Sequence, residues 1–376
     1  MSALTRRDWL KVAAVTPAAL AFPSLAWAAP SGDDVKAVVD KALAFFKGSQ
    51  KDDGNFSANP RAGEPGLTAL VAAALVKNGV PADNPVVAKS LKYLESKVQK
   101  DGGVYNQGLS NYMTCLAVMT FKEANAGGKY DKTIESAVKY VKSLQFADGL
   151  TEKDSSFGGA GYDKPGAKAR PDMSNTHFMV EALLAGGVSK DDPSIRRALT
   201  YISRSQNLES EFNRLPFAAK AGDADKGGFV YNLSDADNDK SPKLTPEGGL
   251  RSEGGMTYAG LKSFLYAGVG KDDPRVKAAV VWVRKNYTVT ENPGQKDAGL
   301  YYYYHTFAKA MDALGEDMFA DAKGVKHDWR QELFDELKKK QKENGSWANS
   351  NAAFLENLPE LATAFAVMAI GYTKKK

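Results

Sequence analysis

Three carboxylates stand where they could do acid–base chemistry, namely Asp172, Glu253 and Glu360. Glu253 and Glu360 come shortly before Thr257 and Thr363, two threonines at similar places in a repeated segment. If both face one cavity they can act as acid and base, and otherwise they are exposed residues at its mouth. Asp172 is either a catalytic group or the cap of the helix that follows it, since aspartate is a preferred capping residue.

His305 follows four consecutive tyrosines at positions 301–304. In a helix, Tyr301 and Tyr304 lie on one side with His305 beside them. Histidine can exchange protons near neutral pH. His305 is therefore either a catalytic group that lines a cavity or a buried histidine that a neighbour satisfies.

Other polar and aromatic residues could bind a substrate without reacting with it. Polar side chains follow Asp172 from position 174 on, and tyrosines recur in apolar segments. Aromatic rings suit an isoprenoid chain or a sugar ring, although aromatic residues on buried helices usually belong to the core. With Glu360, the candidate substrate-binding residues are Ser174, Asn175, His177, Tyr112, Tyr258 and Tyr304.

The composition of the 376-residue chain limits the available chemistry. Its hydrophobic content (43%) and charged content (25%) are typical of a packed globular protein. The net charge is +5, with no dense basic block before Lys374–Lys376, so we expect no nucleic-acid partner. One cysteine, Cys115, excludes an intramolecular disulfide and an iron–sulfur cluster, and three histidines leave few metal ligands. We expect no metal and no cofactor.

One loop resembles the front of a calcium-binding loop, because Asp235, Asp237 and Asp239 alternate in it. Lys240 stands where such a loop requires glycine, and Pro246 occupies its twelfth position. The pattern favours a solvated loop, with calcium binding as the alternative.

The N-terminus resembles a twin-arginine export signal. Arg6 and Arg7 precede a short apolar stretch at 12–22, and residues 26–28 supply the small-x-small pattern that a signal peptidase cuts after. We expect cleavage before Ala29 and a periplasmic or extracellular protein, with an uncleaved anchor as the alternative. No other segment is long and apolar enough to span a membrane.

Pairs of helices recur along the rest of the chain. The first helix of each pair is amphipathic and ends near a glutamine, at Gln50, Gln99, Gln145, Gln206 and Gln341. The second is apolar nearly all round and contains Thr68, Thr114, Thr176, Thr257, Thr306 or Thr363. The intervals between these threonines, 46, 62, 81, 49 and 57 residues, indicate a repeat of 46–49 residues with long loops inserted at 147–170 and 209–250.

Helices with one apolar face suit an outer layer, and helices that are apolar all round suit an inner one. The sequence therefore predicts an all-α fold in one domain, 29–376: a closed (α/α)6 toroid of about twelve helices in two concentric rings. An open solenoid would need polar helices at its ends. The last inner helix, 361–370, is as apolar as the others, which favours closure.

These features resemble the α/α-toroid superfamily of squalene–hopene cyclases, class II terpenoid cyclases and protein prenyltransferase β-subunits. The resemblance covers the chain after the export signal. It rests on the threonine-led helices and on the Gln-x-x-Asp/Asn-Gly pattern at Gln50 and Gln341, which is one residue shorter at Gln99. It implies a central cavity, open at one end, where an isoprenoid substrate is held.

The two catalytic motifs of that superfamily are incomplete here. Cyclases carry Pro-Asp-x-Asp-Asp-Thr-Ala, and in the matching stretch, 171–177, Ser174 takes the place of the proton donor and Asn175 that of its neighbour. Neither side chain can protonate an alkene. Prenyltransferases bind zinc through Asp, Cys and His, and here His305 matches the histidine, whereas Gly255 and Thr257 replace the other two.

We therefore expect a small hydrophobic or sugar ligand in a central cavity. The leading hypothesis is an exported toroid that binds or converts an isoprenoid-like ligand. The alternatives are a polysaccharide lyase or hydrolase on the same fold, and a non-catalytic interaction scaffold. A closed ring should also bring six distant polar residues to one mouth, beside the loop at 209–250: Asp172, Ser174, Glu253, Tyr304, His305 and Glu360.

Overall fold

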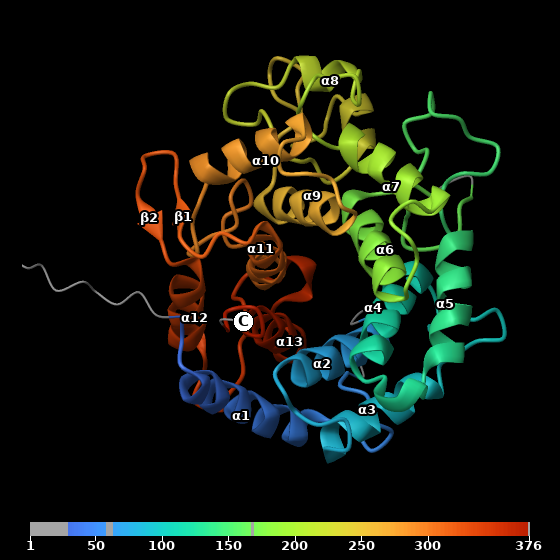
Figure 1. The fold of residues 1–376 in the computed structure, drawn as a ribbon, viewed down its shortest axis with the longest axis vertical. Coiled ribbons are helices and arrows are strands. Elements are labelled where there is room, and N and C mark those ends of the chain that lie inside the picture. Colours follow the sequence, from blue (N-terminus) through green and yellow to red (C-terminus); the bar gives the residue numbers. More distant parts are fainter. Residues whose placement is uncertain (1–28, 58–62, 167–168, 375–376) are drawn as a thin grey trace, which may run out of the picture.

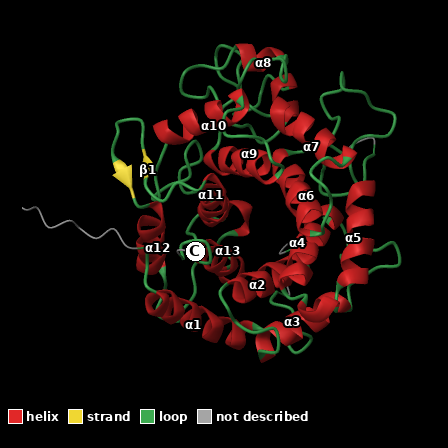
Figure 2. Ribbon diagram, in the orientation of Figure 1, coloured by secondary structure: helices red, strands yellow, loops and turns green. Residues whose placement is uncertain are grey.

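The computed structural model describes residues 29–57, 63–166 and 169–374. The regular secondary structure of this part of the chain is helical except for one two-stranded antiparallel sheet of β1 (Phe319–Ala320) and β2 (Lys326–His327) (Figure 2). None of the helices in these ranges is long and apolar enough to cross a membrane. The predicted export signal at 1–28 lies outside the described residues and stays a prediction.

Twelve helices form two concentric rings (Figure 1). The outer helices are α1 (Gly32–Ser49), α3 (Pro85–Glu95), α5 (Asp131–Ser143), α7 (Pro193–Arg204), α10 (Pro274–Lys285) and α12 (Trp329–Lys340). The inner helices are α2 (Gly66–Lys77), α4 (Ser110–Glu123), α6 (Met173–Ala185), α9 (Gly254–Tyr266), α11 (Leu300–Leu314) and α13 (Pro359–Ile370). A further single turn, α8 (Pro216–Ala219), lies in the inserted loop at 209–250.

Three outer helices begin with a capping side chain followed by a proline. Asn84, Asp192 and Asp273 each accept a hydrogen bond from the backbone amide two residues later, and each precedes a proline in the first turn. Proline fits there because its missing N–H would have no partner in the helix.

The inner ring is closed, because the last inner helix packs against the first. α13 lies beside α2, and the side-chain amide of Asn78 donates a hydrogen bond of 2.8 Å to the carbonyl of Val367. In the outer ring, Lys338 of α12 pairs with Asp34 of α1 at 2.9 Å. The predicted toroid is confirmed, and the open solenoid is not found.

The repeated glutamine joins a repeat to the next at four of the six joints, whereas Gln99 bonds only to Lys97 and Tyr105 near its own loop. The Nε2 of Gln50, after α1, donates to the carbonyls of Gly54 in its own loop and Val86 in α3, both at 3.0 Å. Gln341, after the last outer helix, makes the same pair of bonds to Gly345 and to Val38 in α1. The equivalent bonds to the next outer helix run from Gln145 to Ser194 and from Gln206 to Arg275.

A glycine beside each glutamine lets the loop approach the next outer helix. At Gly345, φ is +85°, and an added Cβ would lie 2.2 Å from the carbonyl oxygen of Lys41 in α1. The same close approach, 1.9 to 2.6 Å, occurs at Gly54, Gly102, Gly158 and Gly227. Real Cβ atoms do not come that close to an oxygen, so only glycine fits.

Four of the six repeated threonines fasten these loops to the inner helices. The hydroxyl of Thr114 accepts a hydrogen bond of 2.9 Å from the backbone amide of Val104. Thr176, Thr257 and Thr363 accept equivalent bonds from the amides of Ala160, Phe229 and Trp347. The threonines that reveal the repeats in the sequence are therefore, at these four positions, acceptors of hydrogen bonds from the loop backbone.

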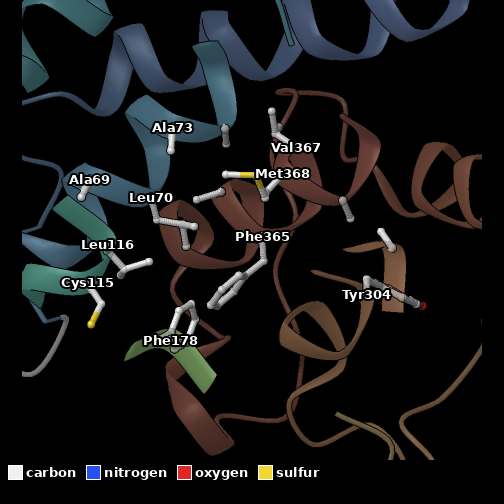
Figure 3. Packing of buried hydrophobic residues seen from close by; sticks show 14 of the residues in the cluster. Ala69, Leu70, Ala73, Cys115, Leu116, Phe178, Tyr304, Phe365, Val367 and Met368 are labelled. Atoms are coloured by element: carbon white, nitrogen blue, oxygen red, sulfur yellow. The ribbon is translucent and has the colours of Figure 1, made fainter. Parts of the chain in front are cut away.

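Small residues allow the inner helices to approach one another closely. Ala69 and Ala73 of α2 and Cys115 of α4 are buried in the core (Figure 3). Larger side chains from three helices, Leu70, Leu116 and Phe365, extend into the space that the ring surrounds (Figure 3).

We expect Gly345→Ala to destabilise the protein more than Gly79→Ala does. Gly79 has nearly the same φ, +88°, but nothing lies within 4 Å of its would-be Cβ. The control should cost about 1–2 kcal/mol for the left-handed backbone, and Gly345→Ala about 2–5 kcal/mol because the overlap with α1 adds to it. Urea unfolding measures both. Equal losses would contradict the role given to Gly345 in ring closure.

Candidate functional site

A first cavity of about 230 Å³ lies inside the inner ring, at the N-terminal ends of its helices. Most of its wall is apolar or aromatic. Each inner helix supplies one residue to a ring around the mouth: Gly66, Tyr112, Ser174, Gly255, Tyr302 and Leu361. Leu70, Leu116 and Phe365 line the cavity below this mouth ring (Figure 3).

Both inserted loops border this mouth, as their positions in the sequence predict. Tyr162 of the loop at 147–170 and Tyr231 of the loop at 209–250 line the cavity, and their hydroxyl oxygens lie 3.3 Å apart. Lys243, also in the second loop, pairs with Glu253 at 2.6 Å. Glu253 lines the cavity, so this carboxylate faces it as an ion pair.

Asp172 caps α6 and lies outside the first cavity. Its Oδ1 accepts a hydrogen bond of 2.7 Å from the backbone amide of Asn175, and its Oδ2 accepts one of 2.9 Å from the Asn175 side chain. Burial raises the pKa of Asp172 to about 6, although these bonds favour the ionised form. The structure favours the capping interpretation over a catalytic one.

A chain of polar groups leads from the mouth ring into the protein. The hydroxyl of Ser174 lies 3.2 Å from the Tyr302 hydroxyl, which lies 2.5 Å from Nε2 of His177. The other ring nitrogen of His177 is 3.1 Å from the ammonium group of Lys262. His177 is fully buried and lines neither cavity, so Tyr302 separates it from a ligand in the first one.

Lys262 belongs to a buried charged cluster that sequence reasoning missed. Its ammonium group lies 2.6 Å from Glu181, and Lys309 pairs with the other oxygen of the same carboxylate. Burial lowers the pKa of Lys262 to about 8. Burial opposes ionisation of Glu181, but the two lysines outweigh it and hold the pKa of this carboxyl well below its usual value.

His305 lies at the other end of the ring. It lines a second cavity, of about 450 Å³, at the C-terminal ends of the inner helices. Burial and the nearby Lys309 hold the pKa of His305 well below its usual value, so the ring is neutral. Neither ring nitrogen has a hydrogen-bond partner among the described residues.

The expected convergence of six polar residues at one mouth is therefore wrong. Only Ser174 and Glu253 line the first cavity. Asp172 is a helix cap, His305 lines the second cavity, and Glu360 is half-buried and lines neither.

Tyr304 does not line the first cavity, because α11 is aligned differently from the other inner helices. In five inner helices the residue two before the repeated threonine lines the first cavity, but in α11 it is Tyr302, four before Thr306, that does so. Tyr304 donates a hydrogen bond of 3.0 Å to the carbonyl of Val289 and points away from the interior space (Figure 3). Thr306 is thus two residues out of alignment with the other threonines.

The remaining candidates divide between cavity and core. Tyr112 lines the first cavity. Tyr258 is buried against Tyr303 and Phe307, with ring centroids 5.6 and 4.9 Å apart, and lines neither cavity. Asn175 is fully buried and binds Asp172. Across the described ranges no group of three or more His, Cys, Asp or Glu side chains could hold a metal ion, and the aspartates at 235–239 form none.

Comparison with known proteins agrees with this architecture. The family model of the squalene-hopene cyclase C-terminal domain matches residues 64–223. The ligand-free structure of type II terpene cyclase MstE from Scytonema is 12% identical, covers 91% of this chain and 98% of its own, and has a TM-score of 0.55. A tyrosine-to-phenylalanine variant of that cyclase, also 12% identical, covers 91% and 97%, with a TM-score of 0.54. No curated protein sequence matches the chain.

The chain thus has the fold of a type II terpene cyclase, and its residues 64–223 are similar to the squalene-hopene cyclase C-terminal domain. In this toroid, the position that matches the cyclase proton donor, Ser174, does line the first cavity. Gly255, which matches a prenyltransferase zinc ligand, lines it as well. Both motif positions thus face the cavity where the superfamily resemblance places them, although their side chains differ from the motif.

Ionisation of Asp172 should lower the stability of the toroid as pH rises from about 4 to 7, so that the wild type loses stability relative to Asp172→Asn over this range. The pKa of Asp172 is about 6 in the folded protein, against an ordinary value of 3.8. The folded state therefore binds this proton more tightly than the unfolded state does. Raising the pH removes that proton and destabilises the fold, by up to about 3 kcal/mol. Urea unfolding at several pH values measures the difference between the two proteins. Identical pH dependence would show that Asp172 is not so perturbed.

Proposed function

We propose that this toroid binds a hydrophobic, isoprenoid-like molecule in the first cavity. The observation that carries the proposal is the wall of that cavity, which is built mainly from leucine, methionine, phenylalanine and tyrosine side chains of five of the six inner helices and of both inserted loops. Burying apolar ligand surface against such a wall is favourable by about 25 cal/mol per Å². The likeness in fold to a type II terpene cyclase supports the same ligand class.

The volume and the lining of the cavity suit a small apolar ligand. The cavity volume of about 230 Å³ lies just below the range of about 300–1,000 Å³ that is usual for ligand pockets. Tyrosine rings at the mouth present flat apolar faces, and their hydroxyl groups can orient a polar end of the chain. A polysaccharide would need a polar groove, so the apolar wall favours the isoprenoid over the sugar alternative.

We further propose that the protein does not start a cyclisation by protonating its ligand. A serine hydroxyl, that of Ser174, stands at the position of the cyclase acid, and it is far too weak an acid to protonate an alkene. Two carboxylates remain in the wall. Glu253 is paired with Lys243, and Glu356 accepts hydrogen bonds from the backbone amide of Tyr302 and the side chain of Asn349. Burial raises the pKa of Glu356, but both of its oxygens are occupied as acceptors of these bonds.

We expect Leu361→Trp to block the first cavity. Leu361 is half-buried in the mouth ring, and an indole there would take up space that the ligand needs. Binding of geranylgeraniol, measured by calorimetry, should weaken at least about tenfold, which corresponds to 1.4 kcal/mol. Leu199→Trp, at a half-buried leucine of the outer helix α7, should leave the affinity unchanged. Equal affinities in both variants would place the ligand elsewhere.

Incubation with squalene, oxidosqualene or geranylgeraniol should yield no cyclised product by gas chromatography. The reason is the absence of a strong carboxylic acid at position 174. The matched variant is Ser174→Ala, which should behave as the wild type does. Turnover by the wild type that disappears in Ser174→Ala would overturn this part of the proposal.

A further inference from the structure

The second cavity is built from equivalent residues of the six inner helices. The residue seven positions after each mouth-ring residue defines a layer near the C-terminal ends: Ala73, Met119, Glu181, Lys262, Lys309 and Met368. All of these except Lys262 line the second cavity. The three charged members come from consecutive helices, α6, α9 and α11, and the three apolar members come from α13, α2 and α4. The cavity therefore has a charged half and an apolar half.

The charged half carries more positive than negative charge. Two ammonium groups, of Lys262 and Lys309, contact one carboxylate, Glu181. Lys262 is completely buried and Lys309 is 3% exposed, so water does little to screen the surplus charge. An unbalanced buried charge is costly unless a partner of opposite sign approaches it.

His305 supplies an unused hydrogen-bond donor at the same place. It is 1% exposed, lines the second cavity, and neither of its ring nitrogens has a partner in the described ranges. A neutral imidazole has one N–H donor and one acceptor, and an unpaired buried polar group costs about 1–3 kcal/mol. A ligand oxygen in the cavity would pair this donor.

The other half suits a hydrocarbon chain. Met119 and Met368 line it together with Leu70, Leu116 and Leu184, and methionine adapts its shape to an irregular ligand. The rim carries two exposed lysines, Lys122 and Lys190, and one exposed carboxylate, Glu123. Leu70 and Leu116 also line the first cavity, so a chain in the second cavity would end near the first.

We propose that the second cavity binds the carboxylate of an apolar acid, such as a fatty acid or an isoprenoid acid. The carboxylate lies against Lys309, where it balances the surplus positive charge, and accepts a hydrogen bond from His305. The hydrocarbon chain lies along the methionines and leucines. This site goes beyond the function proposed above, because it uses a different cavity at the opposite end of the ring.

The test uses the full chain and dodecanoate, with dodecanol as the uncharged ligand of equal chain length. We expect calorimetry to show that the wild type binds dodecanoate at least about tenfold more tightly than dodecanol. Lys309→Met should remove this preference, because it leaves one lysine paired with Glu181 and no surplus charge. Lys285→Met makes the same change at an exposed position outside both cavities and should keep the preference.

Two further variants separate charge from folding and one cavity from the other. Glu181→Gln raises the surplus positive charge and should bind dodecanoate more tightly than the wild type does. A gain of affinity in this variant, beside the loss in Lys309→Met, cannot result from misfolding. Leu361→Trp, which fills the first cavity, should leave dodecanoate binding unchanged. Equal affinity for acid and alcohol, binding of neither, or loss of dodecanoate in Leu361→Trp would each overturn the proposal.

Discussion

The ring depends on one repeated contact, in which a glutamine side chain at the end of an outer helix reaches the first turns of the next. Its amide hydrogen-bonds to a carbonyl of its own loop and to one in the neighbouring helix, as Gln50 does with Gly54 and Val86. The contact fixes the spacing of the repeats that it joins. Because Gln341 makes it with α1, the last repeat meets the first as Gln50, Gln145 and Gln206 join their neighbours, and the ring closes. Closure makes an axial space, and the residues that face it determine what the protein can hold.

That space is layered, because each inner helix contributes equivalent residues at each level. Near the N-terminal ends the layer is small, aromatic or apolar and surrounds the first cavity. Seven residues further along, the layer contains three buried charged side chains, two of which line the second cavity. Burying charges costs free energy that an apolar layer would not, so this layer is hard to explain by stability alone. A functional explanation accounts for both the charges and the unpaired His305.

The fold could be predicted from the sequence because its repeated contacts leave repeated residues. Glutamine, glycine and threonine recur at loop joints, where each has a specific hydrogen bond or close approach. The site was harder to predict. Among four consecutive tyrosines nothing in the sequence distinguishes Tyr302, which lines the cavity, from Tyr304, which does not, and Thr306 suggested the wrong register.

The charged residues Glu181, Lys262 and Lys309 were not predicted as a cluster, because a single lysine or glutamate in a helix usually indicates a solvent-exposed face. A signal was present nonetheless. Glu181 and Lys262 each stand five residues after a repeated threonine, in helices that are otherwise apolar. Lys309 takes the same place once α11 is realigned by two residues. Charges at one repeat position of inner helices indicate a buried cluster, and only the alignment of repeats makes this visible.

The central claim is that the first cavity holds an isoprenoid-like chain. A crystal structure of the protein grown with geranylgeraniol tests it most directly. We predict continuous, chain-shaped electron density inside the mouth ring, in contact with Tyr112, Tyr302 and Phe365. An empty first cavity in crystals that hold the ligand elsewhere on the protein would contradict the account.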